Sequence, residues 1–97
     1  MIKINIVFED DVEDVDIISV PDELVPNIEE IGQEFLDWIP STNDNSYFSI
    51  IDGHKYFIAE TDGFVQWLNT HYCQGMQKVC VVKKHTLLCN EYKTLEF

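Results

Sequence analysis

The chain has 97 residues, of which 45% are apolar and 12% aromatic, and its formal net charge is −12. This composition is enough to bury one hydrophobic core, so we expect one folded domain over residues 1–97. The negative charge and the absence of arginine disfavour direct binding to nucleic acid or to anionic membranes. No apolar run is long enough to span a bilayer and no secretory signal is recognisable, so we expect a cytoplasmic protein.

The charge is concentrated in the first half of the chain. Residues 1–45 contain thirteen acidic residues and one lysine, whereas residues 46–97 contain five acidic residues and five lysines. Between residues 4 and 45 there is no cationic side chain. A surface kept for solubility normally mixes both signs, and mutual repulsion of the carboxylates costs stability. A basic partner is therefore the natural complement of this surface.

The first predicted elements are two strands. Residues 2–8 (IKINIVF) alternate between isoleucine or phenylalanine and a second set of side chains, which predicts a half-buried strand. Residues 15–20 (VDIISV) predict a second strand that stops at Pro21. We expect the two strands to form a hairpin that carries six carboxylates on its connection and exposed ends. These are Glu9, Asp10, Asp11, Glu13, Asp14 and Asp16.

A helix is predicted over residues 27–39, with Asn27 and Glu30 as a capping box and Pro40 as its end. Its apolar face carries Ile28, Ile31, Phe35, Trp38 and Ile39. Its opposite face carries Glu29, Glu30, Glu34 and Asp37, spaced so that they form one stripe. The spacing therefore predicts an acidic helix face directed toward solvent.

The second half predicts a hairpin, a helix and two strands. Residues 47–51 and 54–60 flank Asp52-Gly53, the usual signal for a two-residue turn. A helix is predicted from Thr61 or Asp62 to residue 73, followed by strands over residues 78–84 and 92–97. The order β-β-α-β-β-α-β-β predicts an α+β domain, in which two amphipathic helices cover one face of a mainly antiparallel sheet.

One group of residues could carry metal or nucleophile chemistry: His71, Cys73, Cys80, His85 and Cys89. The tight Cys-x-x-Cys or His-x-x-x-His spacing of structural zinc sites is absent, so we expect no metal site. Cys80 lies within VCVV and is expected in the core. Cys73 is expected on the polar side of its helix, near the C-terminus, where the dipole disfavours a thiolate. His71 is expected to be semi-buried and hydrogen-bonded.

The acidic stretch at residues 9–16 does not form a calcium loop, since it lacks the central glycine and the terminal glutamate. The chain also lacks a glycine-rich phosphate loop and a nucleophile elbow. Catalytic carboxylates usually lie in an apolar cleft, whereas these are expected on a solvated turn and helix face. We therefore expect no enzyme and no cofactor.

The acidic surface predicts a small non-enzymatic inhibitor that binds the basic, nucleic-acid-binding surface of another protein, such as a nuclease. The ten acidic residues of the hairpin and the first helix are its expected contacts. In size and charge alone, the chain is similar to immunity proteins against nuclease toxins and to phage DNA mimics of the anti-restriction or anti-CRISPR type. The alternative is an adaptor that binds a peptide or forms a homodimer through a sheet edge, with its charge serving solubility.

Overall fold

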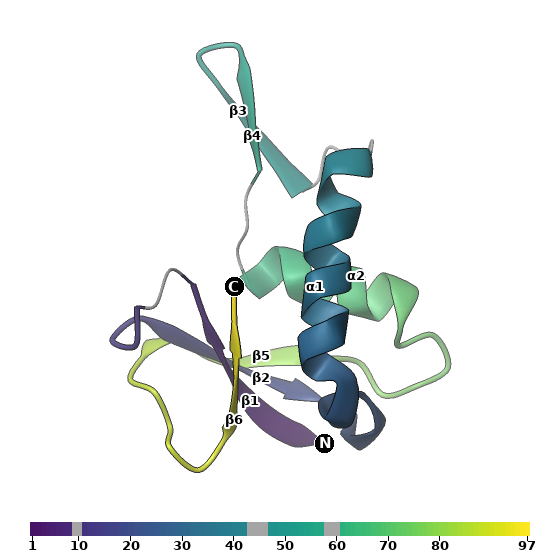
Figure 1. Ribbon diagram of the computed structural model, residues 1–97, viewed down its shortest axis with the longest axis vertical. Helices are drawn as coiled ribbons and strands as arrows, with labels where there is room; N and C mark the ends of the chain where they lie inside the picture. Colours follow the sequence, from purple (N-terminus) through teal and green to yellow (C-terminus); the bar gives the residue numbers. More distant parts are fainter. Residues whose placement is uncertain (9–10, 43–46, 58–60) are drawn as a thin grey trace.

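The computed structural model describes residues 1–8, 11–42, 47–57 and 61–97 (Figure 1). Within these residues there are six strands and two α-helices; each α-helix lies between two pairs of strands along the chain, and a 3-10 helix lies on either side of the first α-helix. In chain order they are β1 (Ile2–Val7), β2 (Val15–Val20), η1 (Asp22–Asn27), α1 (Ile28–Trp38), η2 (Ile39–Ser41), β3 (Phe48–Ile51), β4 (His54–Phe57), α2 (Thr61–His71), β5 (Cys80–Thr86) and β6 (Lys93–Glu96). The α+β class is confirmed, and the order of elements is broadly consistent with the prediction.

Four strands form the main sheet in the order β5-β2-β1-β6. The β1–β2 and β2–β5 pairs are antiparallel, whereas β6 pairs with β1 in parallel. The expected hairpin of the first two strands is confirmed, with Ile4 opposite Ile18. The other two strands, β3 and β4, pair only with each other. The sheet is thus mainly antiparallel, and the second hairpin is separate from it.

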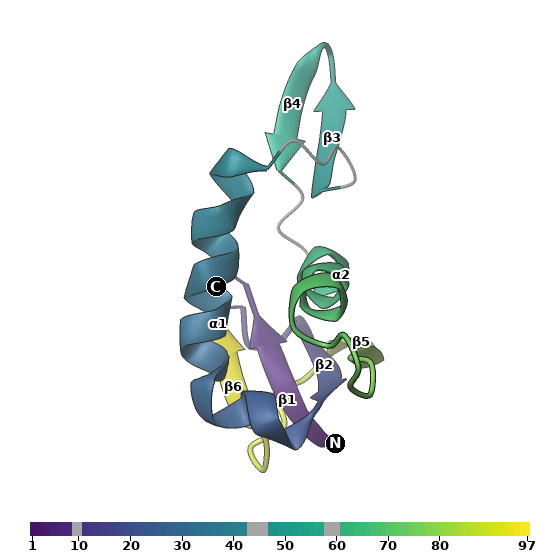
Figure 2. The same ribbon diagram turned by 90° about the vertical axis from the view of Figure 1, so that its right-hand side faces the viewer.

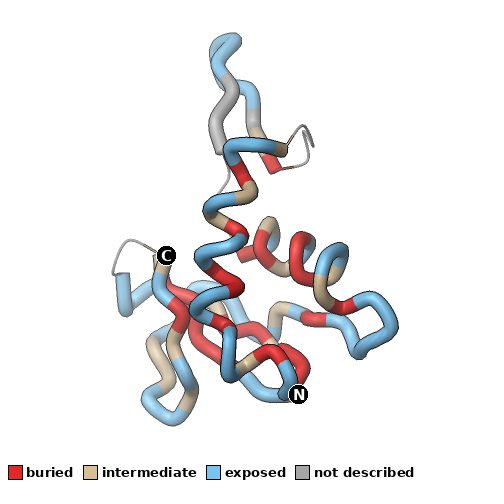
Figure 3. The backbone as a smooth tube through the Cα atoms, turned by 45° about the vertical axis from the view of Figure 1, so that its right-hand side comes forward, coloured by how far each residue is buried: buried red, intermediate tan, exposed pale blue. Residues whose placement is uncertain are grey.

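The hydrophobic core lies between the two helices and one face of the main sheet. Ile4 and Ile6 of β1 belong to the same buried cluster as Phe35 of α1 and Phe64 of α2, so both helices cover this face. Phe35 lies at its centre, with ring centroids 5.3 Å from both Phe64 and Trp67. Figure 3 shows the buried segments concentrated where these elements meet. The period of the apolar residues in both helices is therefore explained by one shared core.

The opposite face of the sheet is also covered, contrary to the prediction of a half-buried first strand. Asn5 and Val7 are fully buried, although they alternate with the core residues Ile4 and Ile6. Residues 87–92 fold back toward this face, and the Asn5 side chain bonds their backbone. Its Nδ2 donates to the Cys89 carbonyl at 2.8 Å, and its Oδ1 accepts from the Cys89 N–H at 3.2 Å. A polar residue in the strand thus fixes the covering segment.

The ends of α1 differ from the sequence prediction. Asn27 precedes the helix but makes no side-chain capping hydrogen bond, so the predicted capping box is wrong. The α-helix ends at Trp38 and is followed directly by the 3-10 helix η2, which includes Pro40. The described part of the chain contains no helix long and apolar enough to cross a membrane.

The β3–β4 hairpin projects away from the helices and the main sheet (Figures 1 and 2). Asp52 and Gly53 both have positive φ, at 52° and 79°, which confirms the predicted two-residue turn. Ile50 and Ile51 beside the turn are 75% and 55% exposed. Residues 43–46, which precede this hairpin, and residues 58–60 of the predicted strand lie outside the described residues. The hairpin therefore exposes apolar side chains at a distance from the core.

Candidate functional sites: an acidic helix face and a pocket at His85

The predicted acidic stripe of α1 is present on the surface. Glu29, Glu30, Glu34 and Asp37 are all exposed, while Ile28, Ile31 and Phe35 on the other side of the helix are buried. No ion pair joins any of these four carboxylates to a cation among the residues the structure describes. The α1 face is therefore a row of negative charge that the described part of the fold does not neutralise.

Two polar neighbours contact this row without cancelling its charge. The Gln33 amide donates to Asp37 Oδ1 at 3.1 Å, and the Tyr72 hydroxyl donates to Glu34 Oε2. Burial raises the pKa of Tyr72 to about 12, assisted by the hydrogen bond to Glu34 and by the Glu34 charge. Glu96 of β6 extends the row, since it lines the same surface hollow as Glu29. Glu96 was not among the predicted contacts, because only the parallel pairing of β6 places it there.

The predicted acidic hairpin has a different environment. Its members Glu9 and Asp10 lie outside the described residues. Asp11, Glu13 and Asp14 are exposed on the connection between β1 and β2, and Asp16 is half-buried in β2. The Asp11 carboxylate accepts a hydrogen bond from the Glu13 N–H at 3.1 Å, which closes a local turn. Part of this row is therefore used within the fold.

Residues 4–45 contain no cationic side chain, but the pairing of β5 with β2 brings His85 to the hairpin acids. The His85 N–H donates to Asp16 Oδ1 at 3.1 Å, and His85 Nδ1 lies 2.7 Å from Asp14 Oδ1. Its hydrogen bond with Asp14 and the charge of Asp14 raise the pKa of His85 above its usual value. The next residue, Lys84, pairs with Asp62 of α2 at 2.5 Å. The strand pairing thus supplies cationic groups from a distant part of the sequence.

Local backbone geometry turns His85 toward these carboxylates. His85 has a positive φ of 53°, which is uncommon for a residue other than glycine. The β2–β5 register shifts between Val15 and Ile17, on either side of Asp16. The irregular pairing therefore coincides with the contact between Asp16 and His85.

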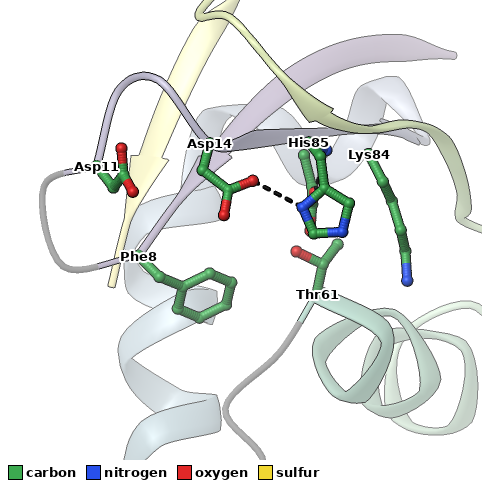
Figure 4. A pocket seen from close by; sticks show the side chains of 7 residues that line it. Phe8, Asp11, Asp14, Thr61, Lys84 and His85 are labelled. Atoms are coloured by element: carbon green, nitrogen blue, oxygen red, sulfur yellow. Dashed lines mark hydrogen bonds and ion pairs between the residues drawn. The ribbon is translucent and has the colours of Figure 1, made fainter.

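A pocket of about 320 Å³ lies beside His85 (Figure 4). It is formed by the end of β1, the β1–β2 connection, β5 and the first residue of α2, Thr61. Its lining residues are Phe8, Asp11, Asp14, Asp16, Thr61, Lys84 and His85. The Thr61 residue is only 1% exposed, and its Oγ1 has no hydrogen-bond partner among the described residues. His85 was considered only as part of the cysteine–histidine group and Thr61 was not considered, because no local motif marks this pocket.

The two acidic rows do not form one continuous surface. In Figure 1 the connection between β1 and β2 lies on one side of β6, and α1 lies on the other. The α1 row is directed to solvent, whereas the hairpin row borders the pocket at His85. The eight predicted contact residues that the structure describes therefore divide between two regions.

The cysteines and histidines considered for metal or nucleophile chemistry do not form one cluster among the described residues. Cys80 is exposed on β5, not in the core, and Cys73 is buried, not on the polar side of α2. Burial raises the pKa of the Cys73 thiol, against the effects of the Val79 backbone and Lys78. His71 is exposed and packs its ring against Trp38 and Trp67, which corrects the expectation of a semi-buried side chain. Cys80 differs from the prediction because β5 exposes most of its residues.

The group that could hold a metal ion is instead Asp14, Asp16 and His85, whose potential ligand atoms all lie within 4.8 Å of one another. Only one of its members, His85, belonged to the cysteine–histidine group. The chain was compared with protein-family models, curated proteins and solved structures, and no match was found.

Proposed function

We propose that the protein is a small non-enzymatic antagonist that uses the outer face of α1 to bind the basic surface of a nucleic-acid-binding protein. The observation that carries this proposal is the row of four exposed carboxylates without a cationic partner among the described residues. Like charges kept together cost stability, and an oppositely charged partner relieves that cost on binding.

The spacing of the row fits a surface that normally binds a phosphate backbone. Glu29 and Asp37 are eight residues apart, which corresponds to about 12 Å along an α-helix. Four charges over this length give one charge per about 4 Å, close to the roughly 3.4 Å axial spacing of phosphates along one DNA strand. A partner that binds phosphates with lysine and arginine could accept this row in their place.

The hairpin row is a weaker candidate for the same role. Asp14 and Asp16 already contact His85, so part of their charge is compensated inside the molecule. We therefore place the principal contact on α1, extended by Glu96, and give the described hairpin acids a secondary role. The class of partner is a nuclease or another nucleic-acid-handling protein, as for an immunity protein or an anti-restriction or anti-CRISPR factor.

The test uses two variants that change the net charge equally. The helix variant carries Glu29→Gln, Glu30→Gln and Asp37→Asn. The control variant carries Glu23→Gln, Asp52→Asn and Glu91→Gln, all exposed and outside both α1 and the acidic hairpin. Glu34 is left unchanged, because it accepts the hydrogen bond from Tyr72.

Each variant is immobilised, exposed to cell lysate at low and high salt, and the retained proteins are identified by mass spectrometry. A retained protein is then purified, and displacement of labelled DNA or RNA from it is measured. If exposed ion pairs contribute about 0.2–1 kcal/mol each, three lost pairs weaken binding by about 3- to 150-fold. We expect this loss, and a flatter salt dependence, in the helix variant alone. Equal displacement by the helix and control variants would refute the role of α1.

A second candidate function is an apolar adaptor, favoured by the projecting β3–β4 hairpin with Ile50 and Ile51 exposed. Exposed apolar side chains on a projecting element are typical of interaction sites. This function predicts binding that is insensitive to salt and is lost after Ile50→Ser with Ile51→Ser. The helix variant would retain its partner in that case, so the same pull-down distinguishes the two functions.

A further inference from the structure

The pocket at His85 has the ligands of a metal site. Two carboxylates, from Asp14 and Asp16, and one imidazole, from His85, offer ligand atoms within 4.8 Å of one another. Imidazole nitrogen suits divalent transition metals such as zinc, cobalt and nickel, and carboxylate oxygen is a common additional ligand. Three protein ligands of this kind leave a coordination position for water.

A small side-chain movement would bring the ligand atoms of Asp14 and His85 to coordination distance. Ligands about 2.1 Å from a tetrahedral metal lie roughly 3.4 Å apart. His85 Nδ1 and Asp14 Oδ1 are 2.7 Å apart, and their side chains are 77% and 54% exposed. The two groups can therefore separate by somewhat less than 1 Å without disturbing the core.

Thr61 gives a separate indication that the pocket holds a ligand. Figure 4 shows the Thr61 side chain entering the pocket from α2, across from the connection that carries Asp14. The residue is 1% exposed and Oγ1 has no hydrogen-bond partner among the described residues. Buried hydroxyls are nearly always hydrogen-bonded. A water molecule bound to an ion in the pocket would supply the missing partner.

The charge of the pocket favours a cation. Asp11, Asp14 and Asp16 all line it, whereas its lysine, Lys84, pairs with Asp62 beside the pocket. The first turn of α2 opposes a cation through its dipole, but that effect is equivalent to about half a charge. The three carboxylates therefore favour a positively charged ligand.

We propose that Asp14, Asp16 and His85 bind one divalent transition-metal ion, and that a water on this ion hydrogen-bonds Thr61. The ion would join the β1–β2 connection to β5, with α2 in contact through its bound water. This proposal is independent of the role of α1, since none of its residues belongs to the α1 row.

The test is a calorimetric titration of the purified protein with Zn²⁺, with thermal unfolding followed in parallel. His85→Gly removes the imidazole and accepts the positive φ without steric cost. His54→Ala is the control, because it removes an imidazole from the projecting hairpin. Thr61→Val removes the hydroxyl and keeps the shape of the side chain.

We expect one Zn²⁺ per chain and a higher melting temperature with Zn²⁺ for the parent protein and for the His54 variant. His85→Gly should lose at least tenfold in affinity, and Thr61→Val about tenfold, the usual effect of losing an outer hydrogen-bond partner. Circular dichroism of the metal-free variants checks that each is folded.

Three results would overturn the proposal. The first is no Zn²⁺ binding by the parent protein, and the second is equal affinity in the His85 and His54 variants. The third comes from the absorption spectrum of the protein titrated with Co²⁺ in place of Zn²⁺. A thiolate-to-cobalt charge-transfer band in that spectrum would place the ion on a cysteine. A fully retained affinity of Thr61→Val would remove Thr61 from the site.

Discussion

Asn5 offers a quantitative test of how the second face of the sheet is covered. Its side chain is fully buried and makes four hydrogen bonds: to the Cys89 carbonyl at 2.8 Å, the Tyr92 carbonyl at 3.3 Å and Thr94 Oγ1 at 3.3 Å, and from the Cys89 N–H at 3.2 Å. The perturbation is Asn5→Ala, which removes all of them. It also leaves the two backbone groups of Cys89 without these partners.

The expected loss of stability follows from the two bonds to Cys89. A hydrogen bond contributes about 0.5–1.5 kcal/mol net, and an unpaired buried partner raises the cost of its removal. We therefore expect Asn5→Ala to lower the free energy of unfolding by about 2–3 kcal/mol. For a domain of this size, that corresponds to a fall in melting temperature of about 8–24 °C.

The assay is urea unfolding monitored by tryptophan fluorescence, together with hydrogen exchange at the Cys89 amide. Asn90→Ala is the matched control, because Asn90 lies in the same segment but is exposed. The control should change stability by less than about 0.5 kcal/mol. If Asn5→Ala were equally mild and the Cys89 amide remained protected, Asn5 would not be the residue that holds the segment.

Four further predictions concern α1, its contact with Tyr72, and the core. Glu34→Gln should lower the Tyr72 pKa from about 12 only part of the way toward 10, since burial is the larger cause; NMR titration of the ring would show it. Because the Tyr72 pKa is higher in the folded state, its contribution to the free energy of unfolding is fully present below about pH 10 and is lost as the pH rises toward 12. Tyr72→Phe should not show this loss when urea unfolding is measured over the same pH range. Phe35→Ala should cost about 3–5 kcal/mol in the same unfolding assay, because Phe35 packs at the centre of the aromatic core. Gly32→Ala should raise the free energy of unfolding by less than the helix-propensity gain of about 1 kcal/mol, because the added Cβ would lie 3.1 Å from the Leu95 side chain. A rise in melting temperature that matches the full gain would show that the Leu95 side chain moves aside without cost.

The regular elements could be predicted from the sequence because their patterns are local. The short apolar run at residues 15–20, which stops at Pro21, corresponds to β2, and the period of the apolar residues in residues 27–39 corresponds to α1. The acidic face of α1 follows from the same pattern, since the side opposite a buried stripe must face solvent. The acidic face of α1, on which the proposed function rests, could therefore be predicted from the sequence without the structure.

The predictions for β1 and β5 were less accurate, because burial of a strand depends on what covers each face. Val7 is buried on the side of the sheet that residues 87–92 cover, and Cys80 is exposed although its neighbours in sequence are apolar. Periodicity cannot show whether a segment 80 residues away will cover a strand, so one-sided burial was the simplest expectation.

The sequence by itself determined the strands, the helices and the charged face of α1, because these depend on which side of each element meets water. The contact of Asp14 and Asp16 with His85, 71 and 69 residues away in the chain, follows from the three-dimensional fold alone. That meeting depends on the pairing of β5 with β2 and on a shift in its register, both of which are set by long-range contacts. The same contacts place Thr61 beside the carboxylates, which is why the pocket could be recognised only in the folded molecule.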